Sequence, residues 1–534
     1  MFTTFPSTNH LIAAIVVALL NAVALCSVSL RLVHMFQLGG YRTRNFVKWI
    51  TDMRVVFFTR LLALSILSFG SMLIVSVMFY HFTQYFFLSY LGLTLYMWLL
   101  IVFCVNISRT KTKVPFVCTA RVKRLFVVLF LISFELSIIA LWIGSRIWDG
   151  FWGPSGIAVI IVLLPALVII SNILLLPVEA IIKNHYIKKA KRKITRHTNL
   201  IRIGITGSYG KTSCKDILAS MLEKKFKVAK SPASFNTPMG FAKTVNDVLD
   251  CSHEILIFEM GLRYKRDIRY LAKLFKPEHG ILTSIGTQHI ETMKTIDAIK
   301  AEKSELVKAV TGIAVLNGES KKCVEVYNEL KKDKWILTNL NEVTNTKITP
   351  DGCSFKVFDM ECTTQLLGKH NIENILMCVA LARELGVDLE DIKAAISELK
   401  PTPHRLELVK APSGIIVLDD SYNGSEHGIR AALDVIDLFE GKKVVQTPGI
   451  IEQGSRSAEA NFKLGRRIAK SADQVIIVNQ LNQTALMDGL RSKDFSADKI
   501  HFAKNLTAAK TLYSKLLKPG DVLLIANDLP DNFN

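Results

Sequence analysis

The sequence predicts a multi-span helical membrane domain followed by two α/β domains. Three observations lead to this fold class: long apolar runs before Thr195, a glycine-rich turn that ends in Gly210-Lys211-Thr212, and an alternation of strand-like and helix-like segments beyond residue 200. The expected division is 1–182 for the membrane domain, 183–199 for a basic juxtamembrane linker, 200–400 for a central domain and 401–534 for a C-terminal domain.

Five apolar runs predict the membrane spans. Each approaches or exceeds the ~20 residues that a helix needs to cross a hydrocarbon core. The runs are Leu11–Leu30, Leu61–Tyr80, Phe86–Val105, Leu125–Gly144 and Gly156–Leu176. A buried helical domain is the alternative, and the number and purity of the runs argue against it.

Charge orients these spans. Residues 1–199 carry 20 Lys and Arg against 4 Asp and Glu, so they hold +16 of the formal net charge of +20. The basic residues crowd the first and third connections and the segment after the last span, which predicts that these parts are cytoplasmic and that the N-terminus lies outside. We therefore expect a multi-pass protein of the cell (inner, cytoplasmic) membrane, with the lipid bilayer as a partner and the remaining domains in the cytoplasm.

Two further inferences follow from the charge distribution. The part beyond residue 199 has no basic stripe interleaved with aromatic residues, so no nucleic-acid partner is expected. The basic cluster Lys188–Arg196 would suit anionic lipid headgroups, although it serves equally well as a topology signal alone.

The chain beyond residue 200 alternates strands with helices. The predicted elements are strands at 201–206, 254–258, 280–284, 312–316, 414–418, 442–447, 474–478 and 521–525, and helices at 212–224, 296–309, 426–438, 458–471 and 506–517. Such alternation is typical of mainly parallel sheets covered by helices. The break near Lys400, followed by Pro401 and Pro403, predicts a hinge between two α/β domains.

The glycine-rich turn reads as a phosphate-binding loop between a strand and a helix. Its backbone N–H groups and the helix N-terminus would hold phosphates, Lys211 would reach the terminal ones, and the Thr212 hydroxyl would hold Mg²⁺. Gly204 lies six residues before Gly210, where the commonest pattern has five. An ordinary turn is the alternative. The expected nucleotide-binding residues here are Gly207, Ser208, Gly210, Lys211, Thr212 and Ser213.

Polar residues follow two of the predicted strands. Glu259 directly follows the predicted strand Glu254–Phe258, and His289 follows the predicted strand that leads into Gly286. Ligands of open α/β sheets bind at the carboxyl ends of strands, so both residues are candidate Mg²⁺ ligands. Taken singly, each could be a capping carboxylate or a surface histidine.

Six segments in order resemble the Mur ligase family, the ATP-dependent enzymes that form amide bonds in cell-wall peptides. The likeness is strongest to the branch that adds D-alanyl-D-alanine to a UDP-muramoyl peptide, and it covers about residues 200–526. The segments are Thr206–Ser213, Ser234–Gly240, Glu259–Gly261, Thr283–Glu291, Gly368–Asn371 with Asn374, and Leu418–Asn423.

The resemblance implies a reaction and a set of roles. In the family, a substrate carboxylate attacks the γ-phosphate of ATP, and an amine captures the resulting acyl phosphate. The catalytic positions are Lys211, Glu259, His289 and Lys303, with Mg²⁺ held by Thr212, Glu259, His289 and a carbamylated Lys303. Asn371 corresponds to an adenine-side contact, Arg405 to an arginine that reaches the phosphates, and Asp420, Tyr422 and Asn423 to residues that position ATP and the amine.

The chain departs from the family pattern in three places that concern the substrate. The membrane region stands where the family carries its UDP-binding domain, Gly424-Ser425-Glu426 replaces Ala-Asn-Pro, and Ala526–Pro530 replaces a Lys-Gly-Ser motif. The expected substrates are therefore a cell-wall or surface-polymer precursor and an amino acid or dipeptide. Whether the spans dock a lipid-linked precursor or only tether the enzyme stays open.

Two other functions remain as alternatives. One is a membrane-anchored P-loop nucleotide switch or transport component, and the other is a membrane protein with an inactive ligase domain. Paired ionisable residues inside the spans would indicate transport. Only Glu135 lies deep in a run, which argues against this function.

Overall fold

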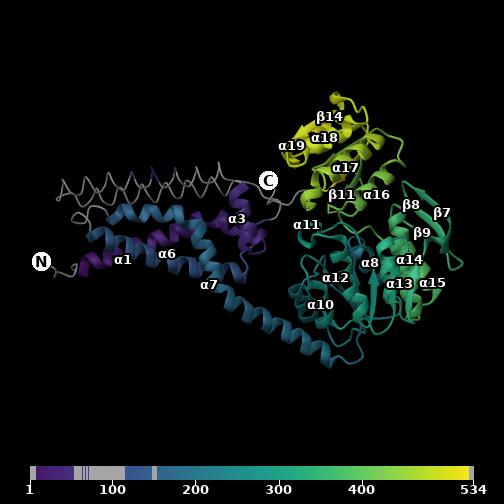
Figure 1. Ribbon diagram of the computed structural model, residues 1–534, viewed down its shortest axis with the longest axis horizontal. Coiled ribbons are helices and arrows are strands. Elements are labelled where there is room, and N and C mark those ends of the chain that lie inside the picture. The colour runs from purple at the N-terminus through teal and green to yellow at the C-terminus, as the bar shows by residue number, and fades with distance from the viewer. Residues whose placement is uncertain are drawn as a thin grey trace. The chain divides into compact units, whose positions relative to one another are not determined.

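The computed structural model describes residues 8–52, 115–146, 153–422 and 424–527, together with positions 63, 66, 67 and 70 (Figure 1). The chain separates into two compact units, one extending to Ile182 and the other formed by Lys183–Asp528. Apart from those four positions, the predicted spans 61–80 and 86–105 lie outside the described residues, as does Asn423.

The first unit is helical. Its elements are α1 (Thr8–Val28), α2 (Leu30–Leu38), α3 (Thr43–Asp52), α6 (Ala120–Arg146) and the first part of α7 (Gly153–Arg196). Within the described residues, Ala120–Ile143 and Ile160–Arg196 are long and apolar enough to cross a membrane, and a third span results if α1 and α2 count as one.

The first apolar run is broken, where the sequence pattern predicts one continuous span over 11–30. Helix α1 ends at Val28, and the axis turns by 43° between the two helices. Two serine hydroxyls bond back to preceding carbonyls at this point, Ser27 to Val23 at 3.0 Å and Ser29 to Cys26 at 2.7 Å. Such back-bonding competes with the helical ladder and bends helices.

Polar contacts join the helices of this unit. The Asn21 side chain on α1 donates to the Ser137 hydroxyl on α6 at 2.8 Å. Arg124 at the start of α6 pairs with Glu179 on α7 at 2.6 Å. In an apolar setting such contacts select one packing partner for each helix, because an unpaired polar group there costs free energy.

The second unit begins with a six-stranded parallel sheet of order β2-β3-β1-β4-β5-β6. Its strands alternate with helices along the chain, because a connection between parallel strands must cross back to the starting end of the sheet. The strands are β1 (Ile201–Thr206), β2 (Val228–Lys230), β3 (Ile255–Glu259), β4 (His279–Leu282), β5 (Ala314–Asn317) and β6 (Trp335–Thr338).

Helices cover both faces of this sheet (Figure 1). Alternate residues of β3 serve the two cores: Ile255 and Ile257 pack with one layer, Leu256 and Phe258 with the other. One layer contains α8 (Lys211–Leu222), α14 (Lys369–Glu384) and α15 (Leu389–Glu398), and the other contains α9 (Pro238–Lys243), a π-helical turn (Thr244–Val248), α10 (Asp267–Phe275), α12 (Ile296–Ala309) and α13 (Lys321–Leu330). The short α11 (Ile290–Met293) follows β4.

A small antiparallel sheet, absent from the sequence-based prediction, precedes α14. It consists of β7 (Val343–Thr349), β8 (Gly352–Val357) and β9 (Met360–Thr364) in that spatial order. Its inward residues, such as Phe355 and Val357, join the core of α8 and α14. Strand β7 is polar and largely exposed, so its sequence lacks the alternation of apolar and polar residues that predicts a strand.

A second six-stranded sheet follows, with order β10-β11-β15-β12-β13-β14. Only the edge strand β10 (Glu407–Lys410) runs antiparallel to its neighbour. The others are β11 (Ile416–Asp420), β12 (Lys443–Thr447), β13 (Gln474–Val478), β14 (Ile500–Ala503) and β15 (Val522–Ala526), connected by α16 (Glu426–Ile436), α17 (Ser457–Ser471), α18 (Gln483–Arg491) and α19 (Leu506–Leu516). The prediction of two mainly parallel α/β sheets is confirmed.

Candidate active site

The glycine-rich loop spans residues 207–210, between β1 and α8. Gly204, which the sequence pattern counts as its first glycine, lies inside β1 instead. Gly210 has a φ of +80°, a conformation that glycine adopts without the Cβ penalty of other residues. Helix α8 begins directly afterwards at Lys211, and the first N–H to bond back within the helix is that of Cys214, to Gly210 O at 2.8 Å.

The loop is fastened to the segment after β4. Ser208 N–H donates to Ser284 O at 2.9 Å, Tyr209 N–H donates to the Ser284 hydroxyl at 2.9 Å, and Gly286 N–H donates to the Ser208 hydroxyl at 2.8 Å. These loop donors are therefore used inside the protein. The donors left for a phosphate include those of the first turn of α8, where helical N–H groups lack intrahelical partners.

Gly207 allows the closest approach in the loop. A Cβ at this position would lie 1.8 Å from the Thr283 hydroxyl oxygen and 3.0 Å from Ser284 N. We expect Gly207→Ala to displace the loop, lower the free energy of unfolding by about 1–3 kcal/mol and remove binding of an ATP analogue. Urea unfolding and calorimetric titration measure the two effects.

The matched control is Gly286→Ala, whose Cβ would meet the Tyr209 ring at 3.3 Å and other atoms only beyond 3.6 Å. This smaller conflict predicts weaker effects on both measurements. Equal losses in the two variants would show that the close contact at Gly207 is not what shapes the loop.

Glu259 lies at the carboxyl end of β3, buried beside the loop. Its Oε2 accepts from the Thr212 hydroxyl at 2.9 Å, and its Oε1 accepts from the Asn236 side chain at 3.0 Å. Lys211 also turns back over the loop, where its Nζ donates to Gly207 O at 2.8 Å. Burial lowers the pKa of the Lys211 ammonium, and the charge of the Glu259 carboxylate opposes this effect.

Lys303 is a buried cation close to these residues. It lies on α12 with 1% of its surface exposed. Burial lowers the pKa of its ammonium well below the usual value, and the charge of Lys211 lowers it further. Within the described part of the chain, no carboxylate forms an ion pair with its Nζ. Burial therefore penalises the charged form of this side chain, and the charge of Glu259 opposes the effect.

His289 follows β4 and precedes α11 with a φ of +64°. Its Nδ1 lies 3.3 Å from a carboxylate oxygen of Glu452, which comes from the segment after β12. Burial lowers the pKa of His289, the Glu452 carboxylate opposes this effect, and the charges of Lys211 and Lys303 act in the same direction as burial. The predicted set Lys211, Glu259, His289 and Lys303 is thus brought into one electrostatic neighbourhood.

The C-terminal sheet contributes Arg405 and Asp420 to the same region. Asp420 ends β11, and its Oδ1 accepts from Leu406 N–H at 3.0 Å. Burial lowers the pKa of Arg405, and the carboxylates of Asp420 and Glu259 oppose this effect. The guanidinium therefore interacts electrostatically with carboxylates from both domains.

The turn that carries Arg405 is shaped by its neighbours. His404 and Leu406 both have positive φ values, 62° and 51°. The His404 ring Nδ1 lies 2.8 Å from a carboxylate oxygen of Asp419, and the backbone N–H of His404 donates to the Glu407 carboxylate at 3.0 Å. These contacts, together with the bond from Arg405 N–H to Thr402 O at 3.0 Å, fix the backbone of the turn at Arg405. Because His404, Glu407 and Asp419 bring potential ligand atoms within 4.8 Å of one another, they also form a metal-type group, and it is only partly buried.

A cavity of about 250 Å³ opens beside the first turns of α8. Three predicted nucleotide-binding residues line it, namely Ser213, Asn371 and Arg405. Asn371 is held at the start of α14, where its side chain donates to Leu367 O at 2.9 Å. The cavity therefore offers a partly open space beside the helix that follows the phosphate loop.

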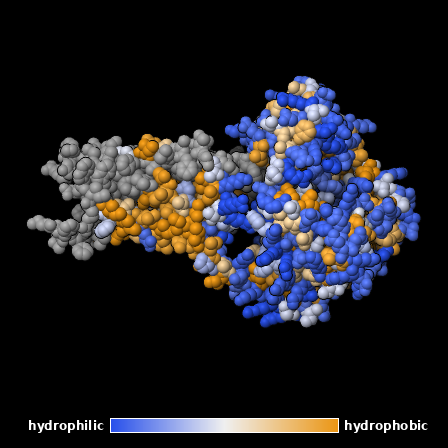
Figure 2. All heavy atoms as spheres, in the orientation of Figure 1, coloured by the Kyte–Doolittle hydropathy of each residue, from blue (hydrophilic) through white to orange (hydrophobic). Residues whose placement is uncertain are grey.

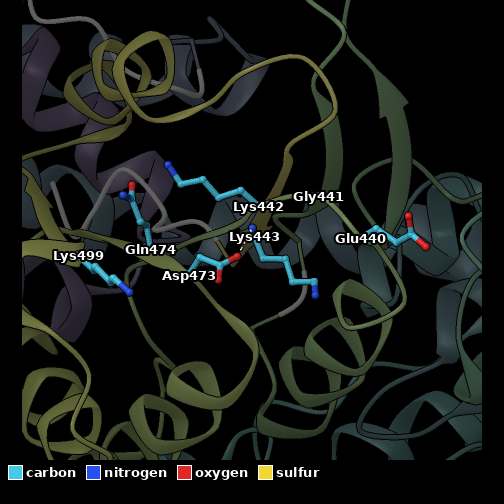
Figure 3. A pocket seen from close by; sticks show the side chains of 7 residues that line it. All are labelled: Glu440, Gly441, Lys442, Lys443, Asp473, Gln474 and Lys499. Carbon is cyan, nitrogen blue, oxygen red and sulfur yellow. Dashed lines mark hydrogen bonds between the residues drawn. The ribbon is translucent and has the colours of Figure 1, made fainter.

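Another cavity, of about 500 Å³, lies at the opposite edge of the C-terminal sheet (Figure 3). Its lining includes Lys443, Gln474 and Lys499, at or beside the amino ends of β12, β13 and β14. Catalytic groups of open parallel sheets gather at the carboxyl ends instead, where Asp420 and Glu452 lie. This cavity is therefore separate from the candidate active site.

Sequence reasoning missed three contributors. Asn236 lies within a motif that had no assigned chemistry, although its side chain binds Glu259. Glu452 had no signal, because it lies in an irregular segment. His427 stacks on the Tyr209 ring with centroids 4.2 Å apart and an interplanar angle of 10°, so a residue of α16 covers the phosphate loop.

Comparisons with known proteins agree with this geometry. The family model described as "Mur ligase middle domain" matches residues 205–382, and that described as "Mur ligase, glutamate ligase domain" matches residues 404–527. The chain is 29% identical over 334 residues to the UDP-N-acetylmuramoyl-tripeptide--D-alanyl-D-alanine ligase of Bacillus subtilis, across 60% of this chain and 72% of the relative.

Solved structures show the same fold. MurF from Acinetobacter baumannii aligns with a TM-score of 0.58 at 22% identity, over 65% of this chain and 77% of that chain. MurF ligase from Thermotoga maritima, solved in complex with ADP, aligns with a TM-score of 0.55 at 25% identity, over 65% of this chain and 80% of that chain. The two family matches together cover more than half of the chain. Through residues 205–527, the chain belongs to the Mur ligase family of ATP-dependent acid–amino-acid ligases.

Proposed function

We propose that this protein is a membrane-anchored ligase that joins a carboxylate of a cell-wall precursor to the amine of an amino acid or dipeptide. The observation that carries the proposal is the meeting of Lys211, the Thr212–Glu259 pair and buried Lys303 at the carboxyl edge of one sheet. In this proposal residues 1–182 form the membrane domain and 183–199 the juxtamembrane linker, while 200–400 bind ATP and 401–534 complete the site.

The proposed reaction has two steps. The substrate carboxylate attacks the γ-phosphate of ATP, so that an acyl phosphate forms and the bond to ADP breaks. The amine then attacks the acyl carbon, an amide forms, phosphate leaves and the amine loses a proton. Both steps concentrate negative charge, which Lys211 and Arg405 are placed to stabilise. Contacts between the domains, such as Tyr209 with His427, would exclude water from the acyl phosphate.

The residues present fit a magnesium ion. The Glu259 carboxylate and the Thr212 hydroxyl lie 2.9 Å apart and offer the oxygen ligands that this cation prefers. His289 and a carbamylated Lys303 are the further ligands in the proposal. A bound Mg²⁺ would neutralise phosphate charge. The protein's own part is to hold these oxygens in place, which it does through the Asn236 amide on Glu259.

The relatives suggest the substrate class. The Bacillus subtilis relative compared above is named a UDP-N-acetylmuramoyl-tripeptide--D-alanyl-D-alanine ligase. We therefore propose a muramoyl peptide as the carboxylate substrate and a D-alanyl-D-alanine type of dipeptide as the amine. The family matches begin at residue 205, and we propose that residues before this position take part in recognising the precursor's carrier group.

Surface chemistry supports the membrane part of the proposal. In Figure 2 the described surface of the helical unit is mostly hydrophobic, while that of the Lys183–Asp528 unit is mostly hydrophilic. Exposed apolar side chains recur along α6 and α7, among them Val127, Leu131, Trp142, Leu163, Ile173 and Ile181. Apolar surface of this extent on a soluble protein would be unusual, but it suits contact with lipid.

The function is tested by measuring phosphate release from ATP by the detergent-solubilised full-length protein. We expect release only when a muramoyl tripeptide and D-alanyl-D-alanine are both present, with one amide formed per ADP. ATP turnover that is independent of both substrates, with no amide product, would contradict the ligase function and favour the nucleotide-switch alternative.

Membrane anchoring is tested separately by fractionation. We expect the protein to stay in the membrane pellet after alkaline carbonate washing and to be released by detergent, because spanning helices do not dissociate in water. Recovery in the carbonate supernatant would contradict the anchoring while leaving the ligase function intact.

Lys303 gives a prediction about covalent modification. A neutral, buried amine can add to CO₂, which forms an N–C bond and releases a proton, and the lowered pKa of Lys303 favours the neutral form. We expect bicarbonate depletion to lower activity, and we expect short carboxylic acids to restore part of the activity of Lys303→Ala. Initial rates and intact mass measure the two effects.

Lys300, on the same helix, provides the matched control. It is 17% exposed at its side chain and pairs with Glu325 and Glu329 at the surface. Lys300→Ala should keep its dependence on bicarbonate. A free amine at Lys303 in an active, bicarbonate-depleted enzyme would contradict carbamylation.

A further inference from the structure

A cavity of about 560 Å³ lies between the juxtamembrane end of α7 and the segment 234–247. Its lining combines Tyr186 from α7 with Phe235, Asn236, Met239 and Lys243. Tyr186 lies before the first residue of either family match, so this wall of the cavity belongs to the part of the chain that the family does not share.

The juxtamembrane end of α7 is firmly attached to the central domain. Ile187, Ala190 and Ile194 are buried in the core that also contains Phe241. Asn246 contacts two turns of α7. Its side-chain amide donates to Tyr186 O at 3.2 Å, and its backbone carbonyl accepts from Lys193 Nζ at 3.2 Å. Tyr186 therefore has a defined position, yet its residue surface remains 47% exposed.

Asn236 links this cavity to the phosphoryl-transfer residues. Its side chain donates to Glu259 Oε1 at 3.0 Å, and its carbonyl accepts from Gly261 N–H at 2.9 Å. A Cβ on Gly261 would lie 2.6 Å from the Asn236 side chain, so the two segments are in tight contact. A ligand in the cavity thus lies one residue away from Glu259.

The lining is amphipathic and holds charges of both signs, from Lys243 and Asp247. Tyr186, Phe235 and the 40%-exposed Met239 offer apolar and aromatic surface on which a sugar or peptide can pack. Lys243 supplies a positive charge, with its Nζ 5.1 Å from the centre of the Phe235 ring. Among the described residues it forms no ion pair. Its charge is therefore available to a phosphate group.

We propose that this cavity binds the acyl substrate, a diphosphate-linked muramoyl peptide, and that Tyr186 of the juxtamembrane helix contacts it. The inference rests on the proposed function and adds the site of the precursor to it. Lys243 pairs with the diphosphate, and the peptide carboxylate points past Asn236 toward Glu259. The helix that leaves the apolar unit then replaces part of the recognition that a separate UDP-binding domain would perform.

The test uses full-length protein in detergent and the variants Tyr186→Ala and Lys243→Met. At saturating ATP and dipeptide, we expect the KM for the muramoyl tripeptide to rise at least about tenfold, since burial of an aromatic ring contributes ~1.5–3 kcal/mol. The KM for ATP and the kcat should stay within about twofold. Tyr186→Phe should retain most of the affinity, because it keeps the ring.

Two variants serve as matched controls. Tyr270 on α10 is 45% exposed, and Lys273 on the same helix is also exposed, and neither lines the cavity. Tyr270→Ala and Lys273→Met should leave every kinetic constant unchanged. A similar rise of KM in these controls would contradict a specific role of the cavity.

Two probes identify the carrier group: the tripeptide on UDP and the same tripeptide on a polyprenyl diphosphate. A rise of KM for either probe in Tyr186→Ala supports the proposal and names the carrier that the cavity accepts. An unchanged KM for both probes overturns it. Calorimetric binding of the two probes needs no turnover, so it separates this outcome from failure of the ligase function. If Tyr186→Ala weakens the binding of a probe, the result supports the cavity even without ligation. If neither probe binds to the wild type, the result overturns the proposal.

Discussion

Replacement of Lys211 by alanine is expected to lower kcat for ligation by at least about 10³-fold. Lys211 begins α8 directly after the phosphate loop, and Glu259 and Arg405 are its principal electrostatic neighbours. Its charge would act on the transferring phosphoryl group, where one preorganised charge or donor contributes about 10²–10³-fold or more to the rate. Phosphate release from ATP and the amide product are the measurements.

The fold should survive this change. Among the described residues the Lys211 side chain donates one hydrogen bond, to Gly207 O, so the urea midpoint should move little. Lys224→Ala is the matched control, because Lys224 follows the same helix and pairs with Glu398 at the surface. Ligation by Lys211→Ala at the wild-type rate would overturn the assignment of the phosphate loop.

Glu259→Gln is expected to reduce kcat by about 10²–10³-fold and to raise the Mg²⁺ concentration required for half-maximal activity at least about tenfold. The substitution removes the negative charge that would hold the cation but keeps the size of the side chain. The Thr212 hydroxyl can rotate to accept from the new amide, and Asn236 can still donate to the remaining oxygen. The loss should therefore appear in activity and metal dependence, with little change in stability.

Glu254→Gln provides the comparison for this variant. Glu254 directly precedes the same strand, at its amino end, where its carboxylate accepts from Lys227 N–H at 2.9 Å. Because Glu254 lies at the opposite end of the strand, Glu254→Gln should leave the Mg²⁺ concentration for half-maximal activity unchanged. Equal magnesium curves for the wild type and Glu259→Gln would remove Glu259 from the proposed metal site.

The elements that could be predicted have strong local patterns. Helix 296–309 and the strands 201–206 and 474–478 were predicted with the bounds that the structure has. The prediction for β4 extended to residue 284, but the strand ends at Leu282. The reason is that the Thr283 and Ser284 hydroxyls turn to the carbonyl of Tyr209 in the phosphate loop, and this long-range contact has no signature in the strand itself.

The environment of Lys303 illustrates what a sequence leaves open. In the segment Lys300-Ala-Glu-Lys303, two lysines on one helix have similar sequence surroundings. Yet Lys300 pairs with glutamates at the surface, while Lys303 is buried near Lys211. Only the packing of α12 against the sheet distinguishes them, because one side of the helix faces the active site and the other faces water.

The sequence by itself determined the apolar runs, the alternation of strands and helices, and the phosphate loop with Lys211 and Thr212. These features depend on residues within a few positions of one another, so periodicity and turn chemistry are sufficient to predict them. The tertiary structure alone decided that Glu452 meets His289, that Asn236 holds Glu259, and that Tyr186 lines a cavity next to it. Such pairings join segments that are distant in the chain, and their free energy depends on burial and exact separation, which arise only when the layers pack.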